Sequence, residues 1–196
     1  EARAEMHLGL GPFADQVDRV DARTTSDNLR HLLNAIAARI EGRGLALRPK
    51  EARLSATRAA FVCLKMGGRL RGCIGSLTAT GPLWESVRDM AAEAAFADPR
   101  FMPLTARELP RVELEVTVLS PLEKIEDPGE VVVGRHGLFI SRGNRQGVLL
   151  PQVATEYGWD RETFLDETCQ KAGLPPGCWR QEGAEIYVFT ATVFGE

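Results

Sequence analysis

Leu70-Arg71-Gly72-Cys73-Ile74-Gly75 is the stretch around which the rest of the chain is organised. It follows Gly67-Gly68, a pair typical of a two-residue hairpin turn because glycine readily adopts positive φ angles. We therefore predict a hairpin whose strands cover residues 58–66 and 69–76. Side chains alternate between the faces of a regular strand, so Leu70 and Ile74 would face a core and Arg71 and Cys73 the other side. A bulge at Gly72 or Gly75 would reverse this assignment.

Cys73 is the candidate nucleophile of this stretch. Neighbouring cations such as Arg71 lower the pKa of a thiol and favour the reactive thiolate. Gly72 and Gly75 leave the backbone bare, so a ligand could approach closely, and they join Arg71 as candidate ligand-binding residues. The alternative is a structural cysteine, because a free cysteine commonly packs in a core as a small hydrophobic residue.

The composition is that of a folded domain without a strong global charge. The chain has 196 residues, 44% of them hydrophobic, and a net charge of −3, which disfavours nonspecific binding to nucleic acid. Its four cysteines show neither a CxxC pair nor a zinc-ligand spacing, so we predict no metal site and a reducing, cytoplasmic setting. No membrane span or signal peptide is visible, and no glycine fingerprint indicates a particular cofactor.

Hydrophobic periodicity predicts the framework of a larger subdomain. Apolar residues at helical spacing predict helices over residues 27–41 and 82–97. Strict alternation predicts a half-buried strand over residues 112–119. Residues 1–24 show no clear pattern and are assigned to an N-terminal arm, ahead of a domain over residues 25–196.

A smaller, β-rich subdomain is predicted around residues 120–150. Turns that contain glycine separate three short strands there, at residues 130–134, 138–142 and 147–150. Two helices follow, the second capped by Asp160. A final strand over residues 185–194 has apolar or β-branched residues on both faces, which indicates a strand covered on two sides. The sequence shows no internal repeat.

Three further side chains are candidates for acid–base chemistry. Glu113 and Glu115 share the polar face of the strand over residues 112–119. They would orient Arg71 or act as a base if this face adjoins the motif, and otherwise they are solvated. His136 lies in a predicted turn and is the histidine outside the N-terminal region, so it is the candidate general acid or base by elimination; alternatively it is merely exposed.

Seven stretches carry a resemblance over almost the whole chain. They are LRGCIG (70–75), AFADPRFMPL (95–104), LEVTVLSP (114–121), HGL (136–138), GVLLPQV (147–153), GWDRETFL (158–165) and IYVFTATVF (186–194). These stretches resemble the AMMECR-type domain family, whose bacterial and archaeal members are called AmmeMemoRadiSam system protein A. With the helix over residues 27–41 they reach from about Ser26 to the C-terminus. Arg100 and Gln152 lie within them and are added as candidate ligand-binding residues.

The resemblance implies an architecture and partners rather than a reaction. It implies an α/β (α+β) fold, in which a mixed sheet flanked by helices adjoins a second, smaller β-rich subdomain with a cleft between them. It implies action with a Memo-type protein, related to non-haem iron dioxygenases, and with a radical S-adenosylmethionine enzyme. Because a fold alone does not give a function, the site residues must carry the functional argument.

Two functions fit the candidate residues. In the first, the chain is a cysteine-dependent enzyme in which Cys73 attacks, His136 moves the proton, and Glu113 or Glu115 orients the reacting groups. In the second, it is a non-catalytic module that uses the same cleft to bind a small-molecule or peptide ligand, or a partner protein. Substitution of Cys73 would then leave binding intact, whereas Arg71→Ala would weaken it. A nucleic-acid-modifying accessory ranks third because the chain is mildly acidic.

Overall fold

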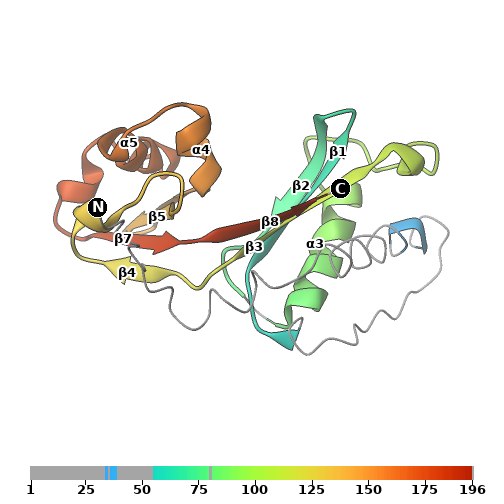
Figure 1. Ribbon diagram of the computed structural model, residues 1–196, viewed down its shortest axis with the longest axis horizontal. Coiled ribbons are helices and arrows are strands. Elements are labelled where there is room, and N and C mark those ends of the chain that lie inside the picture. The colour runs from blue at the N-terminus through green and yellow to red at the C-terminus, as the bar shows by residue number, and fades with distance from the viewer. Residues whose placement is uncertain (1–33, 35, 39–54, 80, 196) are drawn as a thin grey trace, which may run out of the picture.

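The computed structural model of the chain has two lobes, and each lobe consists of a four-stranded sheet that packs against helical segments (Figure 1). It describes residues 34, 36–38, 55–79 and 81–195. The first sheet has the strand order β2-β1-β3-β8 and the second β4-β7-β5-β6. The predicted α/β class is confirmed, but the sheets are antiparallel rather than mixed. The helical connections join strands that are not neighbours in a sheet, and each sheet contains one hairpin, β1–β2 or β5–β6.

The first lobe begins with the predicted hairpin. Its strands are β1 (Ala60–Met66) and β2 (Arg69–Gly75), and Gly67 and Gly68 turn between them with φ angles of 56° and 72°. Helix α3 (Leu83–Phe96) follows, and β3 (Glu113–Leu119) pairs with the other side of β1. Both elements agree with their predicted ranges. A short 3₁₀ helix, η2 (Leu109–Arg111), leads into β3.

Helix α3 covers one face of the first sheet. Alternate residues of β1 and β3 point towards this helix and are buried, as the alternation in sequence predicts; they include Val62, Leu64, Leu114, Val116 and Val118. The predicted helix over residues 27–41 lies largely outside the described residues, but residues 34 and 36–38 are helical and Ile36 joins this core. We call the sheet face opposite α3 the outer face.

The second lobe contains the predicted meander and the two helices after it. Its strands are β4 (Glu123–Ile125), β5 (Gly137–Arg142), β6 (Arg145–Leu149) and β7 (Ala184–Phe189). Its helices are α4 (Pro151–Glu156) and α5 (Arg161–Lys171), with the 3₁₀ helix η4 (Cys178–Arg180). The Asp160 side chain accepts a hydrogen bond from the backbone N–H of Thr163, which confirms the predicted cap.

Two predicted strands need correction. The strand expected over residues 130–134 is absent from the described fold; the chain instead forms the 3₁₀ helix η3 (Pro128–Glu130), because proline fixes its first position and Asp127 accepts the N–H of Gly129. The strand expected over residues 185–194 is two strands, β7 and β8 (Ala191–Gly195), which belong to different sheets.

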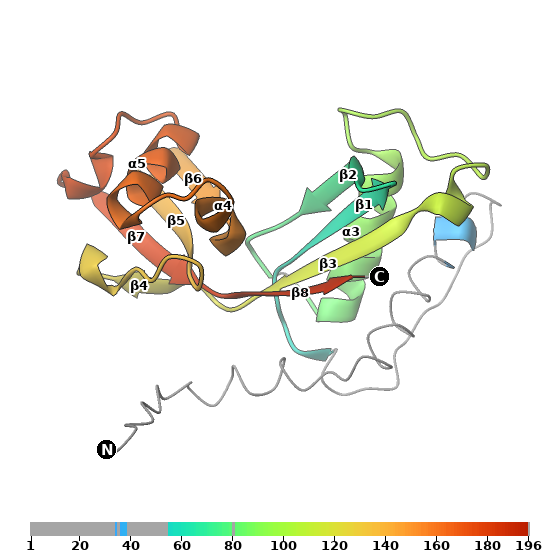
Figure 2. The same ribbon diagram turned by 45° about the horizontal axis from the view of Figure 1, so that its top comes forward.

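Each sheet is completed by an edge strand that directly follows a strand of the other sheet. Strand β3 of the first sheet leads directly into β4 of the second, and β7 of the second leads into β8 of the first (Figure 2). The two connections are hydrogen-bonded where they cross: Ser120 N–H donates to the Thr190 carbonyl (2.9 Å), and Thr190 N–H donates to Ser120 Oγ (2.9 Å). The lobes are therefore joined by a continuous two-stranded connection rather than by a loop.

A separate small core fills the junction between the lobes. The outer face of the first sheet contributes Phe61 and Leu119, and the helix-free face of the second contributes Val148 and Phe189. The two faces that carry no α3 or α5 therefore converge at this core. Residues next to Phe61 on the outer face, Cys63 among them, lie beside the junction.

Candidate functional site

The motif strand β2 contains a bulge that changes the predicted faces. Leu64 pairs with Gly72 but Lys65 pairs with Leu70, so Arg71 is an extra residue with no partner across the hairpin. Leu70 therefore shares the outer face with Lys65 and is 43% exposed. The prediction that Leu70 faces the core beside Ile74, and that Arg71 shares a face with Cys73, is wrong because the bulge shifts the alternation by one residue.

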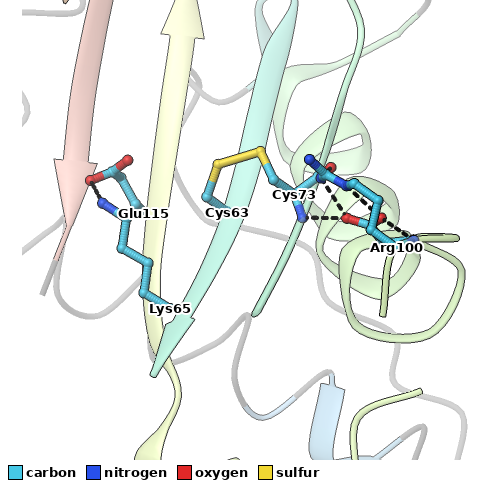
Figure 3. The surroundings of a disulfide bond; sticks show 6 residues. Cys63, Lys65, Cys73, Arg100 and Glu115 are labelled. Carbon is cyan, nitrogen blue, oxygen red and sulfur yellow. Dashed lines mark hydrogen bonds and ion pairs between the residues drawn. A yellow bond between two sulfur atoms is a disulfide. The ribbon is translucent and has the colours of Figure 1, made fainter. Parts of the chain in front are cut away.

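Cys73 is bonded to Cys63 across the hairpin, with Cα atoms 4.1 Å apart (Figure 3). The expected free thiol of Cys73 is thus corrected: in this structure its sulfur is in a disulfide and cannot be a thiolate. Both cysteines are half-buried on the outer face. A catalytic role for Cys73 stays a prediction, and it requires this bond to be opened first.

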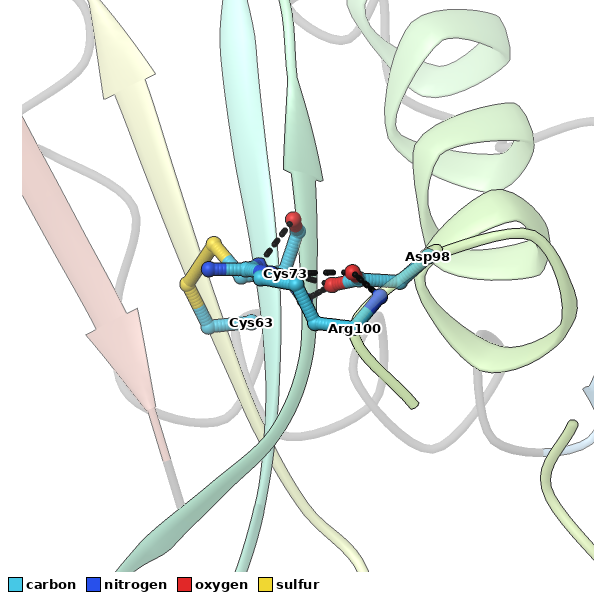
Figure 4. A network of polar contacts seen from close by, with 4 residues as sticks. All are labelled: Cys63, Cys73, Asp98 and Arg100. Carbon is cyan, nitrogen blue, oxygen red and sulfur yellow. Dashed lines mark hydrogen bonds and ion pairs between the residues drawn. A yellow bond between two sulfur atoms is a disulfide. The ribbon is translucent and has the colours of Figure 1, made fainter. Parts of the chain in front are cut away.

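A carboxylate and a guanidinium hold the free edge of β2 at Cys73 (Figure 4). Directly opposed residues at such a short Cα separation form a pair without mutual hydrogen bonds, so the backbone N–H and C=O of Cys73 point away from β1. Asp98 Oδ2 accepts the N–H at 2.8 Å, and Arg100 Nη2 donates to the carbonyl at 3.0 Å. The two side chains take the place of a neighbouring strand.

Asp98 and Arg100 also form a bidentate ion pair. Arg100 Nε and Nη2 donate to the two Asp98 oxygens at 2.9 and 2.7 Å. The Asp98 carboxylate is almost fully buried, and the hydrogen bonds from Arg100 hold its pKa well below the ordinary value although burial opposes this. Arg100, predicted to bind a ligand, is therefore occupied by Asp98 and by the backbone of the motif.

Arg71 reaches from the bulge to the loop before η2. Its Nε and Nη2 donate to the Glu108 carboxylate at 2.9 and 3.2 Å, and Nη2 also donates to the Met102 carbonyl at 2.9 Å. These hydrogen bonds, together with those from the backbone and hydroxyl of Thr105, lower the pKa of Glu108 to about 2. Arg71 is 12% exposed, and its buried Nη1 has no hydrogen-bond partner. The predicted anion-binding guanidinium thus fixes a loop in this structure.

Gly72 and Gly75 face protein atoms rather than open space. A Cβ at Gly72 would lie 2.1 Å from the carbonyl oxygen of Ala94 in α3. A Cβ at Gly75 would lie 2.2 Å from the ring of Phe61. The interpretation that these glycines let a ligand approach is replaced by close packing of a helix and an aromatic ring.

Glu115 is the one predicted acid that lies next to the disulfide. Cys63 pairs with Glu115 across β1 and β3, and Glu115 Oε2 accepts a hydrogen bond from Lys65 Nζ at 2.7 Å (Figure 3). Glu113 lies opposite Lys65 and is exposed. Neither acid contacts Arg71, because the bulge directs Arg71 to Glu108 instead.

His136 and Gln152 belong to the second lobe. His136 precedes β5, and its Nδ1 accepts the N–H of Val132 at 3.3 Å. Burial, and next the charge of Arg135, lower the pKa of His136. Gln152 lies in the first turn of α4 and is half-buried. The structure therefore places Glu115 beside Cys63, the disulfide partner of Cys73, whereas His136 belongs to the other lobe.

Two cavities of the described residues lie away from the predicted site residues. Within residues 55–79 and 81–195, no three acidic, cysteine or histidine side chains are grouped as a metal ion would require. One cavity of about 140 Å³ lies between the start of α3 and the ends of β1 and β2, and one of about 280 Å³ lies against β4, β7 and η4. Neither is lined by a predicted site residue, so the cleft between the subdomains stays a prediction.

No helix in the described residues is long and apolar enough to cross a membrane.

Cys63, Asp98 and Glu108 are the site residues that the sequence prediction missed. With a regular register counted from the Gly67-Gly68 turn, Cys63 would face Gly72; only the extra residue Arg71 brings it opposite Cys73. A bulge leaves no clear signal in a single sequence. Asp98 and Arg100, two residues apart in a proline-containing break after α3, offered the best available signal, because such a pair can satisfy a free strand edge.

Comparison with known proteins gives matches along most of the chain. The family model described as AMMECR1 matches residues 29–194. Protein PH0010 of Pyrococcus horikoshii is 49% identical over 132 residues, which cover 65% of this chain and 64% of that protein. Protein MK0488 of Methanopyrus kandleri is 44% identical over 164 residues, which cover 79% of each. The chain thus spans just under two thirds of the length of the Pyrococcus protein.

A solved structure has the same fold. The crystal structure of uncharacterized protein PH0010 from Pyrococcus horikoshii superimposes with a TM-score of 0.77 at 40% identity. The superposition covers 86% of this chain and 89% of that one.

Proposed function

The chain belongs to the AMMECR1 family, and we propose that it acts as a non-catalytic protein-binding module whose docking surface is the outer face of the first sheet. This surface comprises Lys65, Leu70, Glu115 and the Cys63–Cys73 pair. The observation that carries the proposal is that both arginines predicted to bind a ligand already bind carboxylates of the protein. Arg71 donates to Glu108 and Arg100 to Asp98, and the one nitrogen of Arg71 without a partner, Nη1, is buried, so the pair does not form an open site for a small anionic substrate.

The second lobe shows that a hairpin of this kind packs against its helix without a cysteine pair. At the places of Cys63 and Cys73 it has Phe139 and Val148, which are paired in the same way one residue from a glycine. That lobe forms a comparable sheet and helix without a disulfide in the hairpin. The cysteine pair is therefore not needed to build this arrangement.

The surface has the mixed character of a protein-docking face. Leu70 is 43% exposed at the edge strand, and the ion pair of Lys65 and Glu115 lies beside it. An exposed apolar side chain next to charged ones is compatible with a protein interface, in which apolar contacts are surrounded by polar groups. The partners we propose are those implied by the resemblance, a Memo-type protein and a radical S-adenosylmethionine enzyme in the cytoplasm.

The test is isothermal titration of each purified candidate partner with the full chain. We expect Leu70→Asp combined with Lys65→Ala to weaken binding at least tenfold, or about 1.4 kcal/mol. Arg88→Glu is the matched control, because Arg88 lies on α3, which covers the opposite face. Equal binding by the outer-face variant and wild type, with circular dichroism showing both folded, would overturn the proposal.

A cysteine-dependent enzyme is the second candidate, and the short cross-strand approach of Cys63 and Cys73 beside Glu115 favours it. The double variant Cys63→Ala, Cys73→Ala separates the two functions. A binding module keeps its partner affinity in this variant. A cysteine enzyme loses turnover in it while binding its partner as before, which turnover assays with the reduced chain and its partners would reveal.

A further inference from the structure

The chain contains two disulfides that differ in their surroundings. Cys169 and Cys178 are nine residues apart in sequence, and both are fully buried in the core of the second lobe. Cys63 and Cys73 are ten residues apart, and both are half-buried on the outer face of the first sheet. Loop length therefore does not distinguish the two bonds, whereas access by solvent does.

We propose that Cys63–Cys73 is a thiol-exchange site that a dithiol reductant opens in the folded protein. A disulfide is reduced by attack of a thiolate on one of its sulfurs, so an accessible bond reacts and a buried one does not. Exposed disulfides are accordingly the labile ones within a protein. The proposal does not rest on partner binding and goes beyond the function proposed above.

The fold around the bond is held independently of the sulfur atoms. Strand β1 lies between β2 and β3 and is paired with both. The free edge of Cys73 is bound by Asp98 and Arg100, at 2.8 and 3.0 Å. Opening the bond therefore leaves the two residues opposite each other, and the thiols can re-form the bond when an oxidant of the disulfide class is present.

The exchange balances with one dithiol. Its first thiolate attacks a cysteine sulfur, the Cys63–Cys73 bond breaks, and the released cysteine thiolate takes up a proton. The second thiol of the reductant then breaks the mixed disulfide. The products are two cysteine thiols and the reductant as its own disulfide, so the protein gains two electrons and two protons.

The experiment uses the full chain in dithiothreitol buffers of stepped redox ratio. Free thiols are trapped by alkylation at intervals and assigned by peptide mass spectrometry, while circular dichroism checks that the protein stays folded. We expect Cys63 and Cys73 to be alkylated together at least tenfold faster than Cys169 and Cys178. In the control variant Cys169→Ala, Cys178→Ala, only Cys63 and Cys73 remain. We expect thiol counting on it to give the same rate of alkylation for Cys63 and Cys73 as in the wild type.

Three outcomes would overturn the proposal. The first is that the two cysteine pairs react at equal rates, and the second is that Cys63 and Cys73 react only when the protein unfolds. The third is that both are alkylated before any reductant is added. None of these outcomes depends on a partner, so failure here is distinguishable from failure of the binding proposal.

Discussion

The two lobes follow one plan and differ most along their edge strands, β2 and β6. Each begins with a hairpin, continues into a helical segment, and places a third strand beside the first strand of the hairpin. In each, the fourth strand of the sheet directly follows the third strand of the other lobe: β4 follows β3, and β8 follows β7. The structure thus contains a repeat that the sequence does not reveal, because few positions in it require the same residue type.

The shared requirement is a glycine where the helix crosses the edge strand. Gly72 pairs with buried Leu64, and Gly147 pairs with buried Ile140. A Cβ at Gly72 would lie 2.1 Å from a backbone atom of α3, and one at Gly147 would lie 2.4 Å from the carbonyl oxygen of Thr168 in α5. The helices can approach their sheets only because these positions have no side chain.

The difference is the bulge. Strands β5 and β6 pair from end to end in one register, whereas β2 contains the extra residue Arg71. The second lobe shows that a hairpin and a helix pack well without such a residue. The extra residue Arg71 forms an ion pair with Glu108. The shifted register places Cys63 opposite Cys73, where the two form a disulfide.

The largest expected effect is from alanine at either equivalent glycine. We expect Gly72→Ala and Gly147→Ala each to destabilise the protein by about 3 kcal/mol, because backbone atoms of a packed helix must shift. Chemical denaturation followed by circular dichroism measures this. Gly81→Ala is the control, since its nearest atom is a flexible carboxylate oxygen 3.8 Å away. A tolerated substitution at one position alone would end the proposed equivalence of the lobes.

The second largest effect is expected at the free edge of β2, where Asp98 and Arg100 bind the backbone of Cys73. Asp98→Ala removes the acceptor of the Cys73 N–H and the partner of Arg100, and we expect a loss of about 2 kcal/mol, as for hydrogen bonds to a charged group. Asp98→Asn keeps an acceptor oxygen and should lose less. The unfolding free energies of the two variants, measured at neutral pH, check this order. Equal stability of Asp98→Ala and wild type would show that these contacts at the free edge of β2 do not stabilise the fold.

Elements with strong hydrophobic periodicity can be predicted from the sequence alone. The hairpin at Gly67-Gly68, α3 and β3 were predicted within two residues because their turn residues and apolar spacing are local signals. The sequence predicts one strand over residues 185–194, because a strand that changes sheets at Thr190 alternates much like one that does not.

The site was predicted less well than the fold. Its geometry depends on one unpaired residue, Arg71, and on partners 25 to 37 residues away along the chain, Asp98 and Glu108. Such contacts are set by tertiary packing and have no local signature. The motif itself was found, but the roles of Arg71, Gly72 and Gly75 were assigned to a ligand instead of to the protein.

A pH-dependent effect follows from the Arg71–Glu108 pair, which β6 lacks. The folded-state pKa of Glu108 is about 2, below its ordinary value of 4.5. The folded state therefore binds fewer protons than the unfolded state between these values, so the pair stabilises the protein above pH 4.5 and this contribution is lost as the pH falls towards 2.

Glu108→Gln tests that contribution. We expect it to lower the unfolding free energy by about 1 kcal/mol at neutral pH, and the difference from wild type should shrink as the pH falls through the same window. Denaturant titrations at several pH values measure both chains, and comparing them cancels other acids that titrate there. A difference that stays constant with pH would mean that the charge of Glu108 is not what matters.

The smallest effect compares one surface ion pair from each lobe. Lys65–Glu115 is 2.7 Å long with side chains about one third exposed, and Lys124–Glu185 is 3.0 Å long with side chains nearly half exposed. Exposed pairs contribute little, so double-mutant cycles with alanine should give at most about 0.5 kcal/mol for each. The pair on the first sheet should be the stronger of the two because it is less solvated. If both coupling energies vanish while Lys65→Ala alone still weakens partner binding, the charges of the outer face contribute to recognition rather than to stability.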